Sequence, residues 1–273
     1  AGGPGTIVGM EFSGEIVKCG ENVKNLSIGD RVMCSGASAW AEYAIADYGR
    51  VLKIPDNNMD FITASTLPIA LATMHNAIVT IGNFTKGQTI LIQGASSGVG
   101  LMGLQIAKSL EAKLVIGTST KPKKFDKLKS IGADLVLNSK DKDWVDQVLQ
   151  STNNEGVDLI IDQLSGYTIN ENMKASKVKG TLVNVGRLAG GNSEFNCDIH
   201  ALRRINYRGV TFRTRSKNEI RDVYSKMWTD LSDLVTKGKL SLPIDKIFEF
   251  NDVVDALSCM RGNQHFGKLI LKV

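Results

Sequence analysis

The hydrophobic pattern of the chain divides it into a β-rich part, an α/β part and a C-terminal part. Residues 1–55 contain short β-like pieces at 7–17, 29–36 and 41–46, separated by turn residues. From about residue 72 to 215, short runs rich in valine, isoleucine and leucine alternate with helical patterns. This alternation predicts a parallel sheet with helices on both of its faces. The predicted strands are 88–94, 113–119, 133–139, 157–163, 180–186 and 209–215, and the predicted helices are 101–112, 124–133 and 143–151.

The C-terminal part begins with a strong helix signal. Ser216 and Glu219 have the spacing of a capping box, and Gly238 is placed to end the helix. A strand at 246–250, a helix at 251–260 and a strand at 267–273 follow. We expect this part to complete the β-rich N-terminal part, so that a domain of residues 1–71 and 216–273 is interrupted by a domain of residues 72–215. At 3- and 4-residue spacing, the first helix should bury Ile220, Val223, Tyr224, Met227, Leu231 and Leu234.

Composition and charge exclude several classes of protein. The 33 basic and 28 acidic residues give a net charge of +5, which is far from the dense positive face of a DNA-binding protein. The N-terminal sequence lacks the features of a signal peptide, and no run approaches the ~18 apolar residues of a membrane span. The 4 cysteines are scattered, which argues against structural zinc and against a disulfide framework. We therefore expect a cytoplasmic protein with no metal site and with neither nucleic acid nor membrane as a partner.

The strongest chemical signal is the glycine-rich segment 94–100, which follows an apolar strand and precedes a helix. A backbone without bulky side chains can turn sharply there and approach a pyrophosphate, while the helix N-terminus supplies unpaired N–H groups. The strand–loop–helix context is the one that a dinucleotide site requires. We therefore expect Ser97, Gly98, Val99 and Gly100 to bind the pyrophosphate of a dinucleotide.

The end of the next strand indicates which dinucleotide. An NAD site would place an aspartate or glutamate there for the ribose diol, whereas this chain has hydroxyl groups followed by lysines. Two charge-assisted hydrogen bonds to a 2′-phosphate would favour NADP over NAD by about a hundredfold or more. The alternative interpretation is a solvated basic helix start. The candidate ligands of the 2′-phosphate at this position are Thr118, Ser119, Thr120, Lys123 and Lys124.

Together, the motifs at 9–17, 29–32, 67–73, 94–100 and 265–269 resemble those of the medium-chain dehydrogenase/reductase superfamily, specifically its zinc-free quinone oxidoreductase (zeta-crystallin-like) branch. The resemblance implies an α/β fold in which a Rossmann doubly wound parallel sheet is inserted in a GroES-like β-rich catalytic domain. It also implies an N-terminal truncation, because the family has several dozen residues before the motif at 9–17.

The resemblance further implies roles for individual residues. Zinc-dependent members have a histidine at the position of Met10 and a cysteine just before the threonine that matches Thr73; this chain has neither ligand. By position, Thr73 is expected near the carboxamide and Ser139 with the lysines at the 2′-phosphate. Gly186 and Arg187 are expected beside the nicotinamide. No catalytic side chain or proton donor is identified.

These inferences predict an NADPH-dependent, zinc-free oxidoreductase that transfers hydride to a quinone or to an activated C=C bond of an enone or enoyl substrate. The expected partners are a small electrophilic substrate and, by analogy, a second copy in a homodimer. One alternative is an NADPH-binding structural or regulatory protein of the crystallin type without significant turnover. Another is an enoyl reductase that acts on carrier-bound acyl chains. The arginines within 203–215 either bind an anionic substrate tail or form a solvated or subunit-contacting edge.

Overall fold

The computed structural model describes residues 5–55 and 58–273. The first residues of the N-terminal sequence, for which no signal peptide is expected, therefore lie outside the described part. Residue contacts divide the chain into two compact units. Unit 1 consists of Ala1–Ala72 and Arg215–Val273, and unit 2 is the continuous segment Thr73–Thr214. These boundaries differ by one residue from the limits that the sequence predicts.

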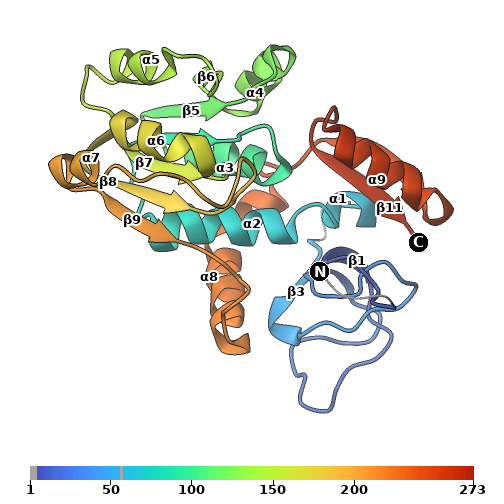
Figure 1. The fold of residues 1–273 in the computed structure, drawn as a ribbon. Helices are drawn as coiled ribbons and strands as arrows, with labels where there is room; N and C mark the ends of the chain where they lie inside the picture. The colour runs from blue at the N-terminus through green and yellow to red at the C-terminus, as the bar shows by residue number, and fades with distance from the viewer. Residues whose placement is uncertain (1–4, 56–57) are drawn as a thin grey trace. The chain divides into compact units, whose positions relative to one another are not determined.

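Unit 2 is built on a six-stranded parallel sheet with the strand order β6-β5-β4-β7-β8-β9 (Figure 1). The chain starts in the middle at β4, moves outward to β6, and then returns to β7 and moves outward on the other side. This order is that of a doubly wound sheet, with its switch point between β4 and β7. The strands are β4 (Thr89–Gln93), β5 (Leu114–Thr118), β6 (Leu135–Leu137), β7 (Val157–Asp162), β8 (Ser176–Asn184) and β9 (Asn206–Gly209).

Helices cover both faces of this sheet. Leu91 of β4 belongs to a buried cluster that includes Trp144 of α5 and Met173 of α6. The next residue, Ile92, faces the opposite way, because a Cβ added to Gly103 of α3 would lie 2.9 Å from its Cδ1. The predicted coverage of the sheet is therefore confirmed. The helices are α3 (Gly98–Ser109), α4 (Phe125–Ile131), α5 (Trp144–Ser151), α6 (Ile169–Ala175) and α7 (Cys197–Arg203).

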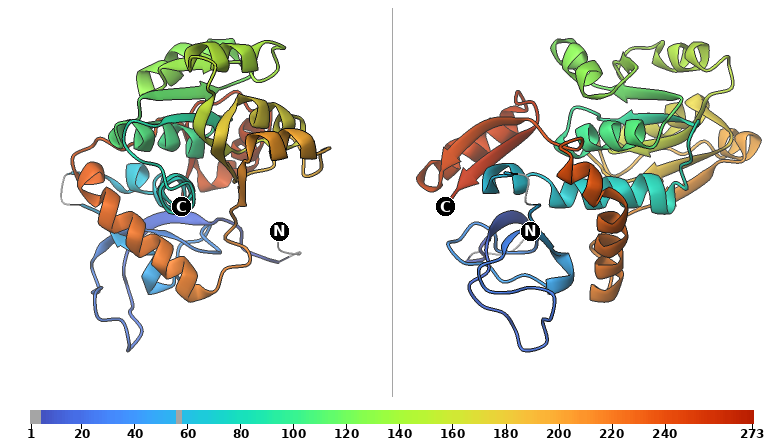
Figure 2. Two further views of the ribbon diagram at one scale, coloured as in Figure 1. Left: turned by 90° about the vertical axis from the view of Figure 1, so that its left-hand side faces the viewer. Right: turned by 180° about the vertical axis from the view of Figure 1, so that it is seen from behind.

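Unit 1 combines elements from both ends of the chain (Figure 2). An antiparallel sheet has the order β1-β2-β3, and a separate pair of parallel strands is formed by β10 and β11. The buried carboxylate of Glu11 in β1 joins these elements, because it pairs with Lys268 of β11 and accepts a hydrogen bond from the Ile69 amide at 2.6 Å. The elements are β1 (Glu11–Glu15), β2 (Arg31–Ser35), β3 (Val51–Lys53), α1 (Phe61–Ala64), α8 (Lys217–Thr236), β10 (Ile244–Glu249), α9 (Val253–Gly262) and β11 (Lys268–Lys272).

The helix α8 confirms its predicted capping box. The Ser216 hydroxyl accepts from the Glu219 amide, and the Glu219 carboxylate accepts from the Ser216 amide at 2.7 Å. The predicted buried face is correct from Val223 to Leu231, but Ile220 is only half-buried, and Val235 is buried where the sequence predicts Leu234. Both positions continue the spacing from Leu231, at four and three residues respectively, so only packing decides between them.

Two predicted strands are wrong. Residues 41–46 form bends and irregular backbone, with Ile45 94% exposed, and the third strand of the sheet is β3 instead. The last strand of the large sheet lies at Asn206–Gly209 rather than at 209–215. Its ladder with β8 ends at the pair Asn184–Gly209, because β8 itself ends there. Val210 is buried, which explains the misleading apolar signal, but it follows the strand.

One described helical segment, Phe61–Ile81, is long and apolar enough to cross a membrane by length and composition. It comprises α1, α2 (Pro68–His75) and the π-helical turn η2 (Asn76–Ile81). The protein buries 67% of its most apolar window. A buried core helix passes the same test, so the segment is only weak support for a membrane span.

Candidate cofactor-binding site

The carboxyl ends of the parallel strands in unit 2 collect most of the predicted site residues at one edge of the sheet. The glycine-rich segment follows β4, the hydroxyl and lysine cluster follows β5, Ser139 follows β6, and Gly186 follows β8. In open α/β sheets, ligands bind at this edge, beside the switch point of the strand order. Thr73 lies instead on α2, where its side chain is half-buried.

The glycine-rich segment has the geometry of a phosphate-binding loop. Gly94 turns the chain at a φ of +70°, and the Ser97 hydroxyl caps α3 by accepting from the Gly100 amide at 3.0 Å. A Cβ on Gly100 would lie 2.7 Å from the Gly94 oxygen and from the Ala95 Cα, so no side chain fits between loop and helix. The amides of Gly98 and Val99 have no acceptor within the helix, and they can bind an anion. The loop therefore fits a pyrophosphate.

Gln163, a residue that the sequence analysis missed, holds this loop across the switch point. Its Nε2 donates to the backbone oxygens of Gln93 at 3.1 Å and Gly94 at 3.3 Å. Its Oε1 accepts from the Ser97 hydroxyl at 2.9 Å. The side chain is 4% exposed, and these bonds satisfy both ends of its amide. The sequence signal was its position at the end of the predicted strand 157–163, next to the switch point.

Thr118 supports the same loop from the other side. Its hydroxyl donates to Gln93 Oε1 at 2.7 Å and accepts from the Gly94 amide at 3.0 Å. Gln93 in turn donates to Asn172 Oδ1 at 2.6 Å. Because Thr118 is fully buried and its hydroxyl is engaged inside the protein, it fixes the glycine-rich segment to the end of β5.

The segment after β5 concentrates hydroxyl and ammonium groups. The Ser119 hydroxyl lies 3.3 Å from that of Ser96 and accepts from the Lys121 amide at 3.3 Å. Thr120 and Lys123 are exposed, whereas Lys124 is only 4% exposed. Residues 119–125, which follow β5, contain three lysines and no carboxylate. This concentration of positive charge favours the binding of an anion.

The Ser139 side chain is buried and is not accessible at the edge of the sheet. It is 4% exposed, and its Oγ lies 3.2 Å from the phenolic oxygen of Tyr167. Tyr167 belongs to the turn η4 (Gly166–Thr168), which follows β7, and it is 47% exposed. Tyr167 could not be identified from the sequence, because nothing in the local pattern places it beside a residue of another loop.

The ends of β7 and β8 form a second buried network. Ser165 has a φ of +55° and a ψ of −148°, a conformation that non-glycine residues rarely adopt. Its hydroxyl donates to the Gly186 oxygen at 2.8 Å and accepts from Asn184. A Cβ on Gly186 would lie 2.5 Å from the Gln163 oxygen. The turn that presents Gly186 and the exposed Arg187 is therefore tightly constrained.

Asp162 anchors the turn after β7. Its Oδ1 accepts from the amides of Leu164 at 2.8 Å and Ser165 at 3.0 Å. Burial is the main cause that raises the pKa of this carboxyl above its ordinary value, while these amide donors lower it. The group is thus a fixed acceptor for the loop backbone.

The arginines of 203–215 do not form one continuous patch of free side chains. Arg203 donates to the Ser176 oxygen at 2.5 Å, and Arg204 ends α7 in a left-handed conformation. Arg204, Arg208 and Arg213 are exposed, whereas Arg203 and Arg215 are half-buried. The hypothesis that this segment binds an anionic substrate tail therefore rests on the exposed members only.

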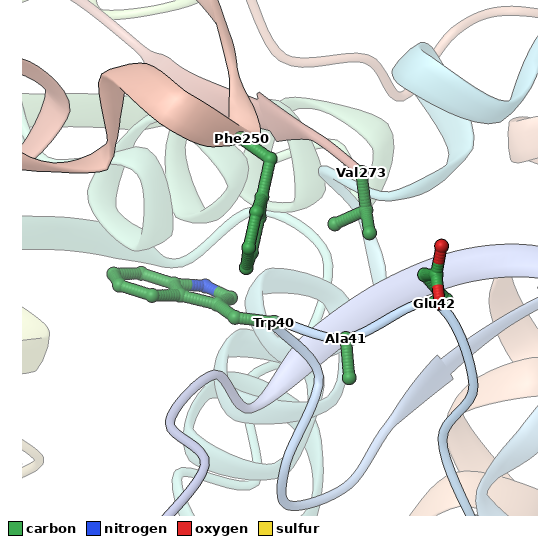
Figure 3. Close-up of a pocket in the computed structure, with 5 residues that line it drawn as sticks. All are labelled: Trp40, Ala41, Glu42, Phe250 and Val273. Carbon is green, nitrogen blue, oxygen red and sulfur yellow. The ribbon is translucent and has the colours of Figure 1, made fainter.

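Unit 1 contains a pocket of about 480 Å³ lined by Trp40, Ala41, Glu42, Phe250 and Val273. Figure 3 shows the Phe250 side chain pointing toward the Trp40 indole. None of these residues belongs to the predicted cofactor site. Among the residues that the structure describes, no group of three or more His, Cys, Asp or Glu side chains could hold a metal ion.

Two protein families match the chain. The family described as zinc-binding dehydrogenase matches residues 98–230, and the alcohol dehydrogenase GroES-like domain matches residues 2–56. The low-reducing polyketide synthase drtA of Aspergillus calidoustus is 28% identical over 97% of this chain, which corresponds to 11% of the synthase. The chain thus spans about a tenth of the length of the curated relatives that it matches.

Solved structures show the same fold. The CurF ER cyclopropanase from the curacin A biosynthetic pathway is 26% identical, with a TM-score of 0.83 over 97% of this chain and 78% of that chain. The mycobacterial protein Rv1454c, solved in complex with NADPH, is 23% identical, with a TM-score of 0.88 over 98% of this chain and 83% of that chain. The second likeness shows the fold alone. The predicted combination of a Rossmann sheet and a GroES-like domain is therefore confirmed.

Proposed function

This chain belongs to the medium-chain dehydrogenase/reductase superfamily of oxidoreductases, and we propose that it uses NADPH to reduce the C=C bond of an enoyl thioester. The observation that supports this substrate class most directly is the alignment with a reducing polyketide synthase over 97% of the chain. The likeness to an ER cyclopropanase at 26% identity points in the same direction.

The choice of NADPH rests on the segment after β5. Three lysines and no carboxylate within 119–125 favour a ligand that carries a phosphate in addition to the pyrophosphate. The amides of Gly98 and Val99 would bind the pyrophosphate, and Ser119 with Lys123 would bind the 2′-phosphate. Thr73, Gly186 and Arg187 would position the nicotinamide.

Bound NADPH would supply the hydride for the β-carbon of an enoyl thioester, and a proton would have to be delivered to the α-carbon. The role of the chain is to orient and fix the cofactor. The buried amide of Gln163 and the hydroxyl of Thr118 hold the glycine-rich segment in one conformation before any ligand binds. Such preorganisation reduces the cost of ordering the loop on binding.

A quinone is the second candidate acceptor, because the sequence motifs resemble the quinone oxidoreductase branch. A third possibility is binding of NADPH without turnover. One experiment separates the three. The protein is mixed with NADPH, and oxidation is followed at 340 nm with a crotonyl thioester, a naphthoquinone or, as the control, a saturated butyryl thioester.

We expect rapid oxidation with the crotonyl thioester, formation of the butyryl product, and no oxidation in the control. Rapid oxidation with the naphthoquinone alone would replace the proposed acceptor by a quinone. Binding of NADPH without oxidation by either acceptor would refute the proposed reaction and favour the structural or regulatory role. Repeating the assay with NADH should give a markedly lower kcat/KM.

A cytoplasmic location and a homodimer are part of the same proposal. The edge strand β9 has only exposed residues, and pairing with β9 of a second copy would extend the sheet. Sedimentation equilibrium of the natural protein tests this assembly, and a monomer at micromolar concentration would exclude it.

A further inference from the structure

The contact between Ser139 and Tyr167 joins two loops that leave distant strands. Ser139 follows β6, the outermost strand on one side, and Tyr167 follows β7, three strands away in the sheet. Neighbouring strands lie about 4.8 Å apart, so these strand ends are separated by roughly 14 Å. The 3.2 Å contact between the two hydroxyl oxygens therefore requires the two loops and the Tyr167 side chain together to span the ends of β5 and β4. The contact brings the Tyr167 hydroxyl to the end of β6, and the neighbouring strand β5 is followed by Lys121, Lys123 and Lys124.

Ser139 and Tyr167 differ in burial, and only Tyr167 is accessible to a ligand. Ser139 is 4% exposed, so its hydroxyl cannot be approached by a ligand while the tyrosine lies against it. Tyr167 is 47% exposed. A phenolic hydroxyl has one hydrogen to donate and can accept at the same time. If Ser139 donates to the tyrosine oxygen, the tyrosine hydrogen is free to point toward a ligand.

The surroundings of this hydroxyl favour a phosphate group. Thr118 of β5 and Leu137 of β6 are register partners, and the Ser119 amide donates to the Leu137 oxygen at 3.0 Å. Ser119 and Ser139 therefore leave neighbouring strand ends, and the lysines follow Ser119 directly. A hydroxyl donor held beside these groups suits a dianion such as a phosphate monoester.

We propose that Tyr167, held in place by Ser139, is a specificity-determining residue that donates a hydrogen bond to the 2′-phosphate of NADPH. This inference rests on the proposed function and deepens it. It also changes the role expected of Ser139, which becomes a positioning residue for Tyr167 rather than a direct ligand of the phosphate.

The test compares dinucleotide affinities by calorimetry on the natural full-length protein. Tyr167→Phe keeps the ring and removes only the hydroxyl. We expect it to weaken NADPH binding by about tenfold or more, equivalent to about 1.4 kcal/mol, and to leave NADH binding within twofold. Adenosine 2′,5′-bisphosphate should lose affinity in the same ratio, whereas AMP should not. Tyr43→Phe, at a tyrosine that is 75% exposed in unit 1, is the matched control and should change neither affinity.

Ser139→Ala distinguishes the two roles of the serine. If Ser139 only positions Tyr167, Ser139→Ala should weaken NADPH binding less than Tyr167→Phe does, by about two- to fivefold. The reason is that water can replace the contact of the serine with the half-exposed tyrosine. A loss for Ser139→Ala that equals or exceeds that of Tyr167→Phe overturns the assignment. Thermal unfolding of each variant shows that the fold is intact.

The outcomes separate this inference from the proposed function. If the wild-type protein prefers NADPH and Tyr167→Phe binds it equally well, the role of Tyr167 is refuted while the cofactor proposal stands. Equal weakening of NADPH and NADH also refutes it, because the tyrosine would then contact a part common to both. A wild-type protein with equal affinity for the two dinucleotides refutes the cofactor proposal, and this inference with it.

Discussion

Gly100 should tolerate no side chain, and the cost of adding one can be worked out from the structure. In Gly100→Ala the new Cβ would lie 2.7 Å from the Ala95 Cα and from the Gly94 oxygen, and 2.8 Å from the Ala95 carbonyl carbon. These are backbone atoms, so no side chain can rotate away, and α3 must shift from the loop. Overpacking of this kind costs about 3 kcal/mol at the upper end of its range. Alanine recovers about 1 kcal/mol of that cost, because it is the better helix former.

The expected net destabilisation is therefore about 2 kcal/mol, which lowers Tm by about 4–8 °C for a domain of this size. Calorimetry or circular dichroism during heating measures it. NADPH affinity should also fall at least tenfold, because the amides of Gly98 and Val99 move with α3. Gly191→Ala is the matched control: nothing lies within 4 Å of its added Cβ, so it should be neutral or slightly stabilising. Equal Tm values for the two variants would refute the packing argument.

Three further predictions follow from individual side chains. Because burial raises the pKa of Asp162, the free energy of unfolding should fall as pH rises from 3.8 through that raised pKa. Urea titrations should show a weaker pH dependence for Asp162→Asn, and an unchanged pH dependence in this variant contradicts the prediction. Cys197 is exposed, whereas burial raises the pKa of Cys34 to about 12, so a thiol reagent at pH 8 should label Cys197 fast and Cys34 only on unfolding. Lys123→Ala should weaken NADPH but not NADH about tenfold or more, given the strength of charge-assisted hydrogen bonds; the same loss in Lys129→Ala would indicate a diffuse charge effect instead.

Much of the fold could be predicted because its signals are local. The strands β4, β5 and β7 each have an apolar run at their centre, which is the pattern of strands buried on both faces. The glycine-rich segment and the capping box at Ser216 are likewise defined by spacing within a few residues. These elements fold as the sequence predicts.

The candidate site was predictable only in part. The glycine-rich segment and the residues after β5, β6 and β8 lie at one edge of the sheet, because parallel strands share a direction. Gln163 and Tyr167 escaped the sequence analysis, since each acts on a residue of another loop. The distance between Ser139 and Tyr167 depends on the strand order and on the turn at Ser165, and neither is encoded in a short segment.

The amino-acid sequence by itself determined where α3, α4, α5, α8, α9 and most of the strands lie and that the large sheet is parallel, and it predicts an anion-binding loop after the first strand of that sheet. These properties depend on hydrophobic periodicity and on side chains within one helical turn or one loop. Only the tertiary structure decided that the last strand of the sheet lies at Asn206–Gly209, that residues 41–46 form no strand, and which side chains brace the loop. Strand pairing and cross-loop hydrogen bonds join residues that are distant along the chain, and their free energy depends on the partner that the fold brings to each of them.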